Sequence, residues 1–341
     1  MADTSTTTDE YTGVISVDSA EASFRNRLGQ FSSRYAVVGV WIALAGLYAA
    51  LIPQTFLTQG TFRTIFGSQQ NQALIFLTAA LLCTIIVGEF VDMSVASNFG
   101  LAAVTVSVLN VNHDWNVWIA SAVAIVVATV VGVVNAYLIV RLGVNTIVVT
   151  LGMGTFLLGV GLWATNMTTV FGLPKDFSQI TLFTVFGLPV GFFYGLILML
   201  IFAYILRFTP LGRNMRFVGE NREVSRLAGV RVTRIRLGAF VMAGLIAGIG
   251  CVLAAAGTGG FDAGVSQMYL LPIFAATFLG SAVLQPGRFN PLGTLIAIFF
   301  LSTGVLGLQI LGAQGWVQQV FYGGVLVIAV TISTILGRRS R

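Results

Sequence analysis

The chain has 341 residues, of which 56% are apolar and only 9% are charged, with a formal net charge of +6. Soluble domains carry about 25% charged residues, so this composition excludes a soluble globular protein. The basic residues lie scattered in short loops between apolar segments, which argues against a nucleic-acid-binding face and indicates membrane topology signals.

Residues 1–34 differ in composition from the rest of the chain. They contain Ser, Thr and acidic residues without an apolar period, which predicts a disordered cytoplasmic tail. No basic segment followed by an apolar stretch marks a cleaved signal peptide. Arg25, Arg27 and Arg34 precede the first apolar segment, and the positive-inside rule places them in the cytoplasm. We expect this tail to be followed by a transmembrane domain over residues 35–341, with the segment 207–236 as its long cytoplasmic loop.

Ten apolar segments follow the tail, and each is read as one membrane crossing, since a bilayer core about 30 Å thick needs about 20 helical residues. The predicted spans are 36–57, 72–88, 93–111, 117–139, 146–165, 188–206, 236–256, 268–284, 292–311 and 317–336. Ten crossings place both termini in the cytoplasm. Of the 18 Lys and Arg residues, all but Arg63 and Lys175 then lie on that side. The sequence therefore predicts an all-α polytopic membrane protein.

Glycines spaced four residues apart occur within the predicted spans, as Gly191/Gly195 and Gly244/Gly248. Such pairs let helices approach closely in lipid. They indicate either tight packing within the chain or a dedicated dimer face.

Spans two to five and seven to ten form two groups of four that begin on opposite sides of the membrane. An inverted repeat, as in many transporters, is therefore a further expectation. Its sequence support is weak and consists of similar loops at Gly88–Asp92 and Gly259–Asp262.

Catalytic and metal sites are not expected in this chain. The single Lys, Lys175, follows Pro174, so no phosphate-binding loop ending in Gly-Lys-Ser or Gly-Lys-Thr is present. One His, at His113, and two Cys, at Cys83 and Cys251, do not provide a zinc cluster or a disulfide framework. We predict no enzyme activity, no cofactor and no metal.

A polar segment separates the second and third predicted spans and contains Glu89, Asp92, Ser94 and Asn98. Acidic side chains at membrane depth are costly and usually face a cavity or a partner. In one interpretation Asp92 caps a helix that begins at Met93 in a short cytoplasmic turn. In the other, a broken helix lines a translocation pathway, and the two interpretations are compatible.

The segment 207–236 is the longest cytoplasmic loop and carries eight Arg residues. Within it, a two-turn helix is predicted, with Asn221 as N-cap and Gly229 as a left-handed stop. Val224 and Leu227 lie on a small apolar face of this helix. Two turns are too short to be stable alone in water, so either the membrane surface or a protein groove must hold the helix.

Four motifs, in chain order, resemble those of bacterial ATP-binding-cassette (ABC) importer permeases of the ribose type. Residues 91–95 resemble I-D-L-S-V, and residues 141–152 resemble R-L-x-V-P-x-x-x-x-T-L-G with Asn145 in place of Pro. Residues 223–229 resemble the E-A-A-x-x-x-G signature, with Val and Ser in place of the two alanines. Residues 280–294 resemble a glycine-rich stretch that ends in G-T.

The resemblance implies the transmembrane subunit of a binding-protein-dependent importer in the bacterial inner membrane. It implies two cytoplasmic ATPase subunits or one tandem ATPase, a second permease copy in a homodimer, and an extracytoplasmic substrate-binding protein. The implied substrate is a monosaccharide or a related polyol, while related permeases carry nucleosides or branched-chain amino acids. A proton-coupled secondary transporter that uses Asp92 or Glu89 is the alternative.

Two sets of residues are candidate sites. The resemblance assigns coupling to the ATPase to Asn221, Glu223, Val224, Ser225, Arg226, Leu227 and Gly229. The polar segment and the matched motif after it give the candidate translocation-pathway residues Asp92, Ser94, Asn98 and Thr150.

Overall fold

Helices dominate the computed structural model, which describes residues 35–88 and 91–339. The predicted tail, residues 1–34, lies outside the described residues, as does Glu89. In chain order the elements are Tyr35–Leu51, α2 (Pro53–Phe56), α3 (Gln59–Gly67), α4 (Gln69–Ile86), α5 (Val95–Ser107), η1 (Val108–Asn112), α6 (Val117–Ala136), η2 (Tyr137–Arg141), α7 (Thr146–Ala164), β1 (Val170–Phe171), α8 (Lys175–Leu182), β2 (Thr184–Val185), β3 (Leu188–Pro189), α9 (Val190–Phe208), α10 (Pro210–Glu220), α11 (Arg222–Leu227), α12 (Val232–Thr258), β4 (Gly260–Phe261), η3 (Gly264–Tyr269), α13 (Leu270–Gly280), α14 (Pro291–Ile310) and α15 (Trp316–Arg339).

Seven helical segments of the described chain are long and apolar enough to cross a membrane. They are Gln59–Ile86, Val95–Asn112, Val117–Arg141, Thr146–Ala164, Val190–Phe208, Val232–Thr258 and Pro291–Ile310. Three shorter apolar helices are Tyr35–Leu51, Gly264–Gly280 and Trp316–Thr331. Every predicted span overlaps one of these segments, so the polytopic helical class is confirmed, and seven of the segments meet the length expected of a crossing.

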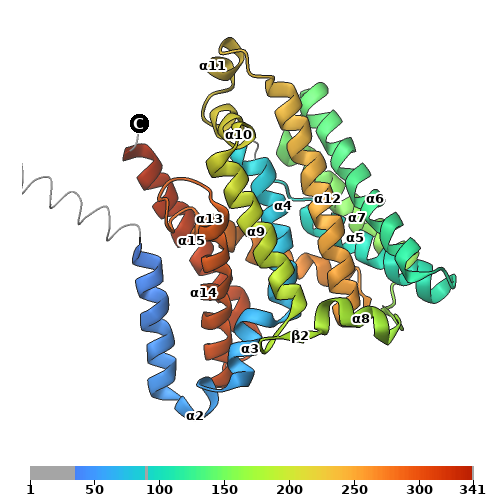
Figure 1. Ribbon diagram of the computed structural model, residues 1–341, viewed down its shortest axis with the longest axis vertical. Helices are drawn as coiled ribbons and strands as arrows, with labels where there is room; N and C mark the ends of the chain where they lie inside the picture. The colour runs from blue at the N-terminus through green and yellow to red at the C-terminus, as the bar shows by residue number, and fades with distance from the viewer. Residues whose placement is uncertain (1–34, 89–90, 340–341) are drawn as a thin grey trace, which may run out of the picture.

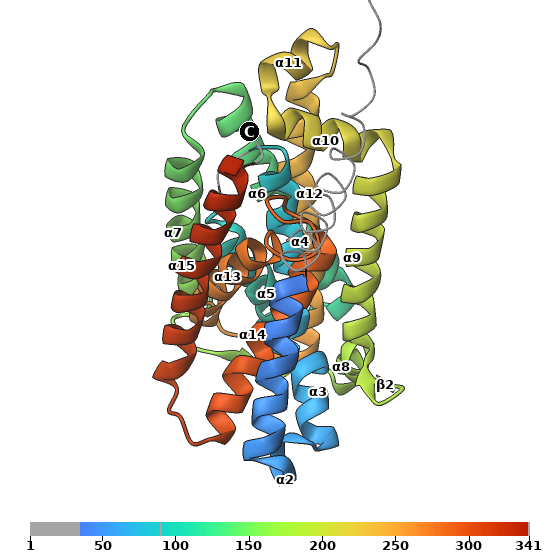
Figure 2. The same cartoon turned by 90° about the vertical axis from the view of Figure 1, so that its left-hand side faces the viewer.

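The long helices form one bundle around α4. In the 18-residue apolar stretch of Gln59–Ile86, which includes α4, 89% is buried, whereas in that of Thr146–Ala164 only 22% is buried. α4 packs against α12, α9, α13 and α14, and Figure 1 shows it between α9 and α12. Figures 1 and 2 place α10 and α11 at one end of the bundle and α2, α3 and α8 at the other. The inner helix α4 therefore links the two ends, while α7 faces outward.

Both predicted glycine pairs pack inside the chain. Gly244 and Gly248 lie against α6, where a Cβ added at Gly244 would lie 2.5 Å from the Ala128 carbonyl oxygen. Gly191 and Gly195 lie against side chains of α4. The pairs therefore bring helices of one subunit together, as the first of the two interpretations predicts.

The C-terminal end of α13 differs from the predicted span 268–284, because this helix ends at Gly280. The buried Asn290 side chain donates hydrogen bonds to the carbonyl oxygens of Gly280 and Val283, at 3.1 and 3.0 Å. Its Oδ1 accepts the amide of Gly293 at 2.6 Å, which caps α14. One amide side chain therefore closes one helix and starts the next, and the apolar residues after Gly280 belong to a turn.

The described residues that follow α4 and α12 share two features. Each helix is followed by a glycine of positive φ, with 75° at Gly88 and 73° at Gly259. In each loop an aspartate Oδ1 accepts the backbone amide two residues further on, at 2.9 Å for Asp92 and 2.7 Å for Asp262. The two segments that are weakly similar in sequence therefore share a positive-φ glycine and an aspartate that accepts a backbone amide.

Candidate functional site

Helix α11 is capped at its N-terminus by Asn221. This residue has an extended backbone, with φ −158° and ψ 111°, and its Oδ1 accepts the amides of Glu223 and Val224, both at 3.1 Å. Two donors of the first turn, which have no partner within the helix, are thereby satisfied. The predicted N-cap is confirmed.

The C-terminus of α11 closes on Gly229, whose φ is +80°. The amide of Gly229 donates to the carbonyl of Arg226, and the amide of Val230 donates to the carbonyl of Ser225, both at 3.0 Å. This pair of bonds is the Schellman motif, in which a left-handed glycine ends a helix. The predicted stop is confirmed, and α11 is a six-residue helix closed at both ends.

The two faces of α11 differ in exposure. Leu227 is 85% exposed and Val224 is 48% exposed, so the small apolar face points away from the bundle. Ser225 is fully buried, and its hydroxyl donates to the Asn221 carbonyl at 2.8 Å. The Ser225 side chain therefore braces the helix from within, and the coupling role assigned to Ser225 stays a prediction. The ion pair between Arg226 and Glu223, at 3.8 Å, is exposed and contributes little to stability.

The segment that carries α11 rests directly on the end of α4. A Cβ added at Gly219, near the end of α10, would lie 2.1 Å from the carbonyl oxygen of Ile86 and 3.2 Å from the amide nitrogen of Gly88. An Arg222 Nη2 donates to the Gly88 carbonyl at 2.5 Å. Backbone packing and a charge-assisted hydrogen bond thus connect α10 and α11 to the inner helix.

A second connection joins α10 to the turn between α13 and α14. Arg288 Nη2 lies 3.2 Å from Glu220 Oε1, and both side chains are more than half exposed. Burial lowers the pKa of the nearby Arg216, and the positive charge of Arg288 acts in the same direction while Glu220 opposes it. The end of α10 therefore contacts both the end of α4 and the turn between α13 and α14.

Helix α10 was not predicted, because residues 207–236 were interpreted as a loop with one short helix. The structure leaves only residues 209–231 between α9 and α12, and most of them are helical. Thr209 caps α10 by accepting the Gly212 amide at 3.2 Å, and Pro210 is the first helical residue. Thr-Pro at a helix start is a recognised signal that could have identified this helix.

The four predicted pathway residues are all buried. Asp92 Oδ1 accepts both the amide and the hydroxyl of Ser94, at 2.9 and 2.7 Å. Asn135 of α6 donates to the same hydroxyl at 2.8 Å. α5 begins at Val95 rather than Met93, so the prediction that Asp92 caps this helix is wrong. The Asp92 carboxylate instead accepts the amide of Ser94, two residues further on, in a turn that precedes the helix.

Hydrogen bonds between polar side chains and their neighbours continue along α5. Asn98 donates to the Ala128 carbonyl at 3.0 Å, and Gln267 of η3 donates to the Ser97 hydroxyl at 2.7 Å. Among the described residues, the buried side-chain atoms without a hydrogen-bond partner include Asn98 Oδ1, Asn135 Oδ1 and Thr150 Oγ1. Buried acceptors without partners are costly, so they mark a place where a ligand or water would be stabilised.

Asn135 and Gln267 are not among the residues predicted from the sequence, whereas Ser97 lies within the predicted polar segment. Asn135 stands inside the predicted span 117–139, and a polar residue within an apolar span is itself a signal of function. Ser97 and Gln267 are far apart in sequence, and only the packing of η3 on α5 brings them together.

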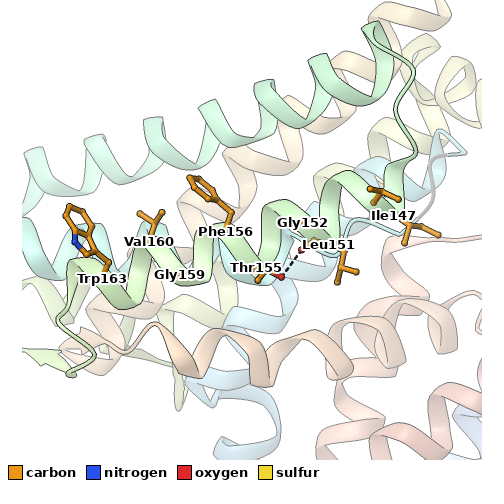
Figure 3. Close-up of a pocket in the computed structure, with 9 residues that line it drawn as sticks. Ile147, Leu151, Gly152, Thr155, Phe156, Gly159, Val160 and Trp163 are labelled. Carbon is orange, nitrogen blue, oxygen red and sulfur yellow. Dashed lines mark hydrogen bonds between the residues drawn. The ribbon is translucent and has the colours of Figure 1, made fainter.

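The outward face of α7 is shown in Figure 3. Ile147, Leu151, Phe156 and Trp163 project from it around a shallow cavity of about 830 Å³. A Cβ added at Gly152, also on this face, would meet nothing within 4 Å. This face is apolar, has no side chains at Gly152 and Gly159, and is not covered by other parts of the described chain.

Comparison with known proteins agrees with this architecture. The chain matches the model of the family described as branched-chain amino acid transport system / permease component over residues 65–330. It is 29% identical over 260 residues to the autoinducer 2 import system permease protein of Photorhabdus temperata, covering 74% of this chain and 78% of the relative. It is 28% identical over 317 residues to the L-arabinose ABC transporter permease protein of Azospirillum brasilense, covering 92% of each. No solved structure matches.

A probable ABC transporter permease protein of Escherichia coli is 32% identical over 200 residues, which cover 58% of this chain and 59% of that relative. The family model itself covers well over half of the chain. Members of this family are transport subunits and not enzymes, and they work with an ATPase and a substrate-binding protein. The chain therefore belongs to the permease family of ABC importers and is a multi-pass subunit of the inner membrane.

Proposed function

We propose that this permease subunit imports a monosaccharide or a related polyol and that α11 is its contact with the ATPase. The exposed apolar face of Leu227 and Val224 on a helix closed at both ends carries the coupling proposal. A rigid short helix with exposed apolar anchors suits insertion into a groove of a partner. The names of the relatives, which refer to autoinducer 2 and L-arabinose, support a small polyhydroxylated substrate.

The substrate proposal is tested with the cognate binding protein. Isothermal titration with L-arabinose, ribose and branched-chain amino acids should give heat with a sugar only. Binding of leucine or valine in place of any sugar would contradict it. Proton-coupled secondary transport, the alternative considered from sequence, is not favoured, because the relatives are permeases of ABC systems.

The proposed topology has ten crossings, with α10 and α11 in the cytoplasm and both termini on that side. The three shorter apolar helices, which complete the count, and the distribution of Arg residues support it. With Cys83 and Cys251 replaced by Ala, single cysteines at the exposed positions Thr168 and Arg213 should react with an impermeant thiol reagent from opposite sides. Reaction of both from one side of intact cells would overturn this topology.

The proposed pathway runs beside the polar cluster of Asp92, Ser94, Asn98 and Thr150. Its support is the burial of all four side chains and the unpartnered acceptors among them and on Asn135. Such a cluster within one subunit can become a polar lining when helices separate during transport.

Substitution of Asp92→Asn keeps the size of the side chain but removes its charge, and we expect transport to fall several-fold while membrane insertion is unchanged. The amide can still accept one hydrogen bond from Ser94, so folding should be retained. Sugar uptake by cells and the amount of permease in the membrane are the two measurements. Full uptake with Asp92→Ala would leave a turn-forming role only.

We further propose that two copies of this subunit assemble with two ATPase subunits or one tandem ATPase. The uncovered face of α7, with its open Gly152 and Gly159, supports a second copy as its neighbour. The native mass of the purified complex distinguishes one permease copy from two, and a single copy would contradict the homodimer.

The two features shared by the described residues after α4 and α12 support the proposal of an inverted repeat over spans two to five and seven to ten. Superposition of the two groups of helices after a rotation about an axis in the membrane plane tests it. A lack of matching helix order would contradict it.

A further inference from the structure

An apolar groove separates α9 from α12 on the outer surface of the bundle. Ile201 and Ile205 of α9 form one wall, and Met242 and Leu245 of α12 form the other. Cys83 of the inner helix α4 lies at the floor, and the cavity measures about 480 Å³. Figure 1 shows α9 and α12 on either side of α4.

The groove runs lengthwise along α12. Its lining on this helix extends from Arg234 to Ile249, which at 1.5 Å per residue corresponds to about 22 Å. One leaflet of a bilayer core is roughly 15 Å thick, half of the whole core. An extended acyl chain of one leaflet therefore fits within its length, whereas a compact sugar would leave most of it empty.

The only charged side chain among the described lining residues is Arg234, which lies in the first turn of α12, next to the α10–α11 segment. The side chain of Arg234 is exposed, and it makes no ion pair or hydrogen bond with the rest of the described chain. Exposed Arg207, Arg213 and Arg231 belong to α9, α10 and the start of α12 at the same end. An apolar slot with one cationic end is complementary to an anionic amphiphile.

We propose that this groove is a binding site for an anionic phospholipid, with one acyl chain between α9 and α12 and the headgroup phosphate on Arg234. Basic pockets between transmembrane helices on the cytoplasmic side are suited to anionic headgroups. The walls also include Leu211 and Met215 of α10. Helix α9 precedes the α10–α11 segment and α12 follows it. The lipid would therefore contact the helices at both ends of the proposed coupling segment.

The test is native mass spectrometry of the full-length permease in detergent, with phosphatidylglycerol or phosphatidylcholine of identical acyl chains. One arginine near a membrane surface favours an anionic lipid by about fivefold, so the wild type should retain phosphatidylglycerol about fivefold better. Arg234→Gln should weaken this preference, and the remainder would be due to Arg207, Arg213 and Arg231 at the same end. Arg141→Gln, which removes an exposed arginine outside the groove, should keep the preference.

A second variant tests the slot rather than the charge. Gly238 lines the groove, and a Cβ added there would meet nothing within 4 Å, so Gly238→Leu fills the slot without a clash in the bundle. It should lower retention of both lipids while the melting temperature of the detergent-solubilised permease is unchanged. Equal retention of the two lipids by the wild type, or an undiminished preference in Arg234→Gln, would overturn the proposal. These outcomes do not depend on the transported substrate.

Discussion

Replacement of Leu227 by Asp is expected to reduce binding-protein-stimulated ATP hydrolysis at least about tenfold while the permease still folds and inserts. Leu227 is 85% exposed, so the free permease loses no packing. In a partner groove, the variant forgoes the burial of a Leu side chain, about 1.5–3 kcal/mol, and places a carboxylate in an apolar contact. Hydrolysis in the reconstituted complex and co-purification of the ATPase are the measurements.

Leu57→Asp is the matched control for this substitution. Leu57 is also strongly exposed, at 70%, but it follows α2 at the opposite end of the bundle. The same change in polarity at this position should leave ATPase association intact. Wild-type hydrolysis and co-purification in the Leu227→Asp variant would refute the assignment of α11 as the coupling helix.

Substitution of Gly219→Val should damage both stability and coupling. The new Cβ would meet the Ile86 carbonyl oxygen at 2.1 Å, and because this atom belongs to the backbone of α4, it cannot rotate away. α10 must shift, and this shift would strain the hydrogen bond between Arg222 and Gly88. Overpacking of this kind costs on the order of 1–3 kcal/mol. We expect a lower melting temperature and severalfold weaker stimulation of the ATPase.

The control for Gly219→Val is Gly152→Val on α7. A Cβ at Gly152 would meet nothing within 4 Å, so this variant makes the same change in side chain without the clash. Its melting temperature should stay near that of the wild type. If Gly219→Val left both the melting temperature and the stimulation of the ATPase unchanged, the contact between α10 and α4 would contribute neither to stability nor to coupling.

The hydropathy of the sequence predicts the helices well and their ends less well. Every predicted span overlaps an apolar helix. A helix that crosses the bilayer core needs a long run of apolar residues, and such a run is visible in the sequence. Helix α12 begins at Val232, four residues before the predicted span. These four residues include the charged Arg234, which lowers their hydropathy, and in the structure Arg234 is exposed at the start of the helix. The end of α13 was missed because Asn290, ten residues beyond it in sequence, decides where the helix stops.

Local motifs of the candidate site were predicted more reliably than its long-range contacts. Asn221 and Gly229 act through neighbouring backbone groups, so their residue types and spacing suffice to predict the caps. The contact of Arg222 with Gly88 joins segments 134 residues apart, and no local pattern encodes it. The buried position of Ser225 also depends on how α11 lies against the rest of the chain.

The most direct test of the account is sugar uptake by proteoliposomes that contain the permease and its ATPase, with the binding protein outside and ATP inside. We expect uptake that requires both ATP and the binding protein and that is lost with Leu227→Asp. Uptake by the permease alone under an imposed proton gradient, without the ATPase, would contradict the assignment of coupling to α11.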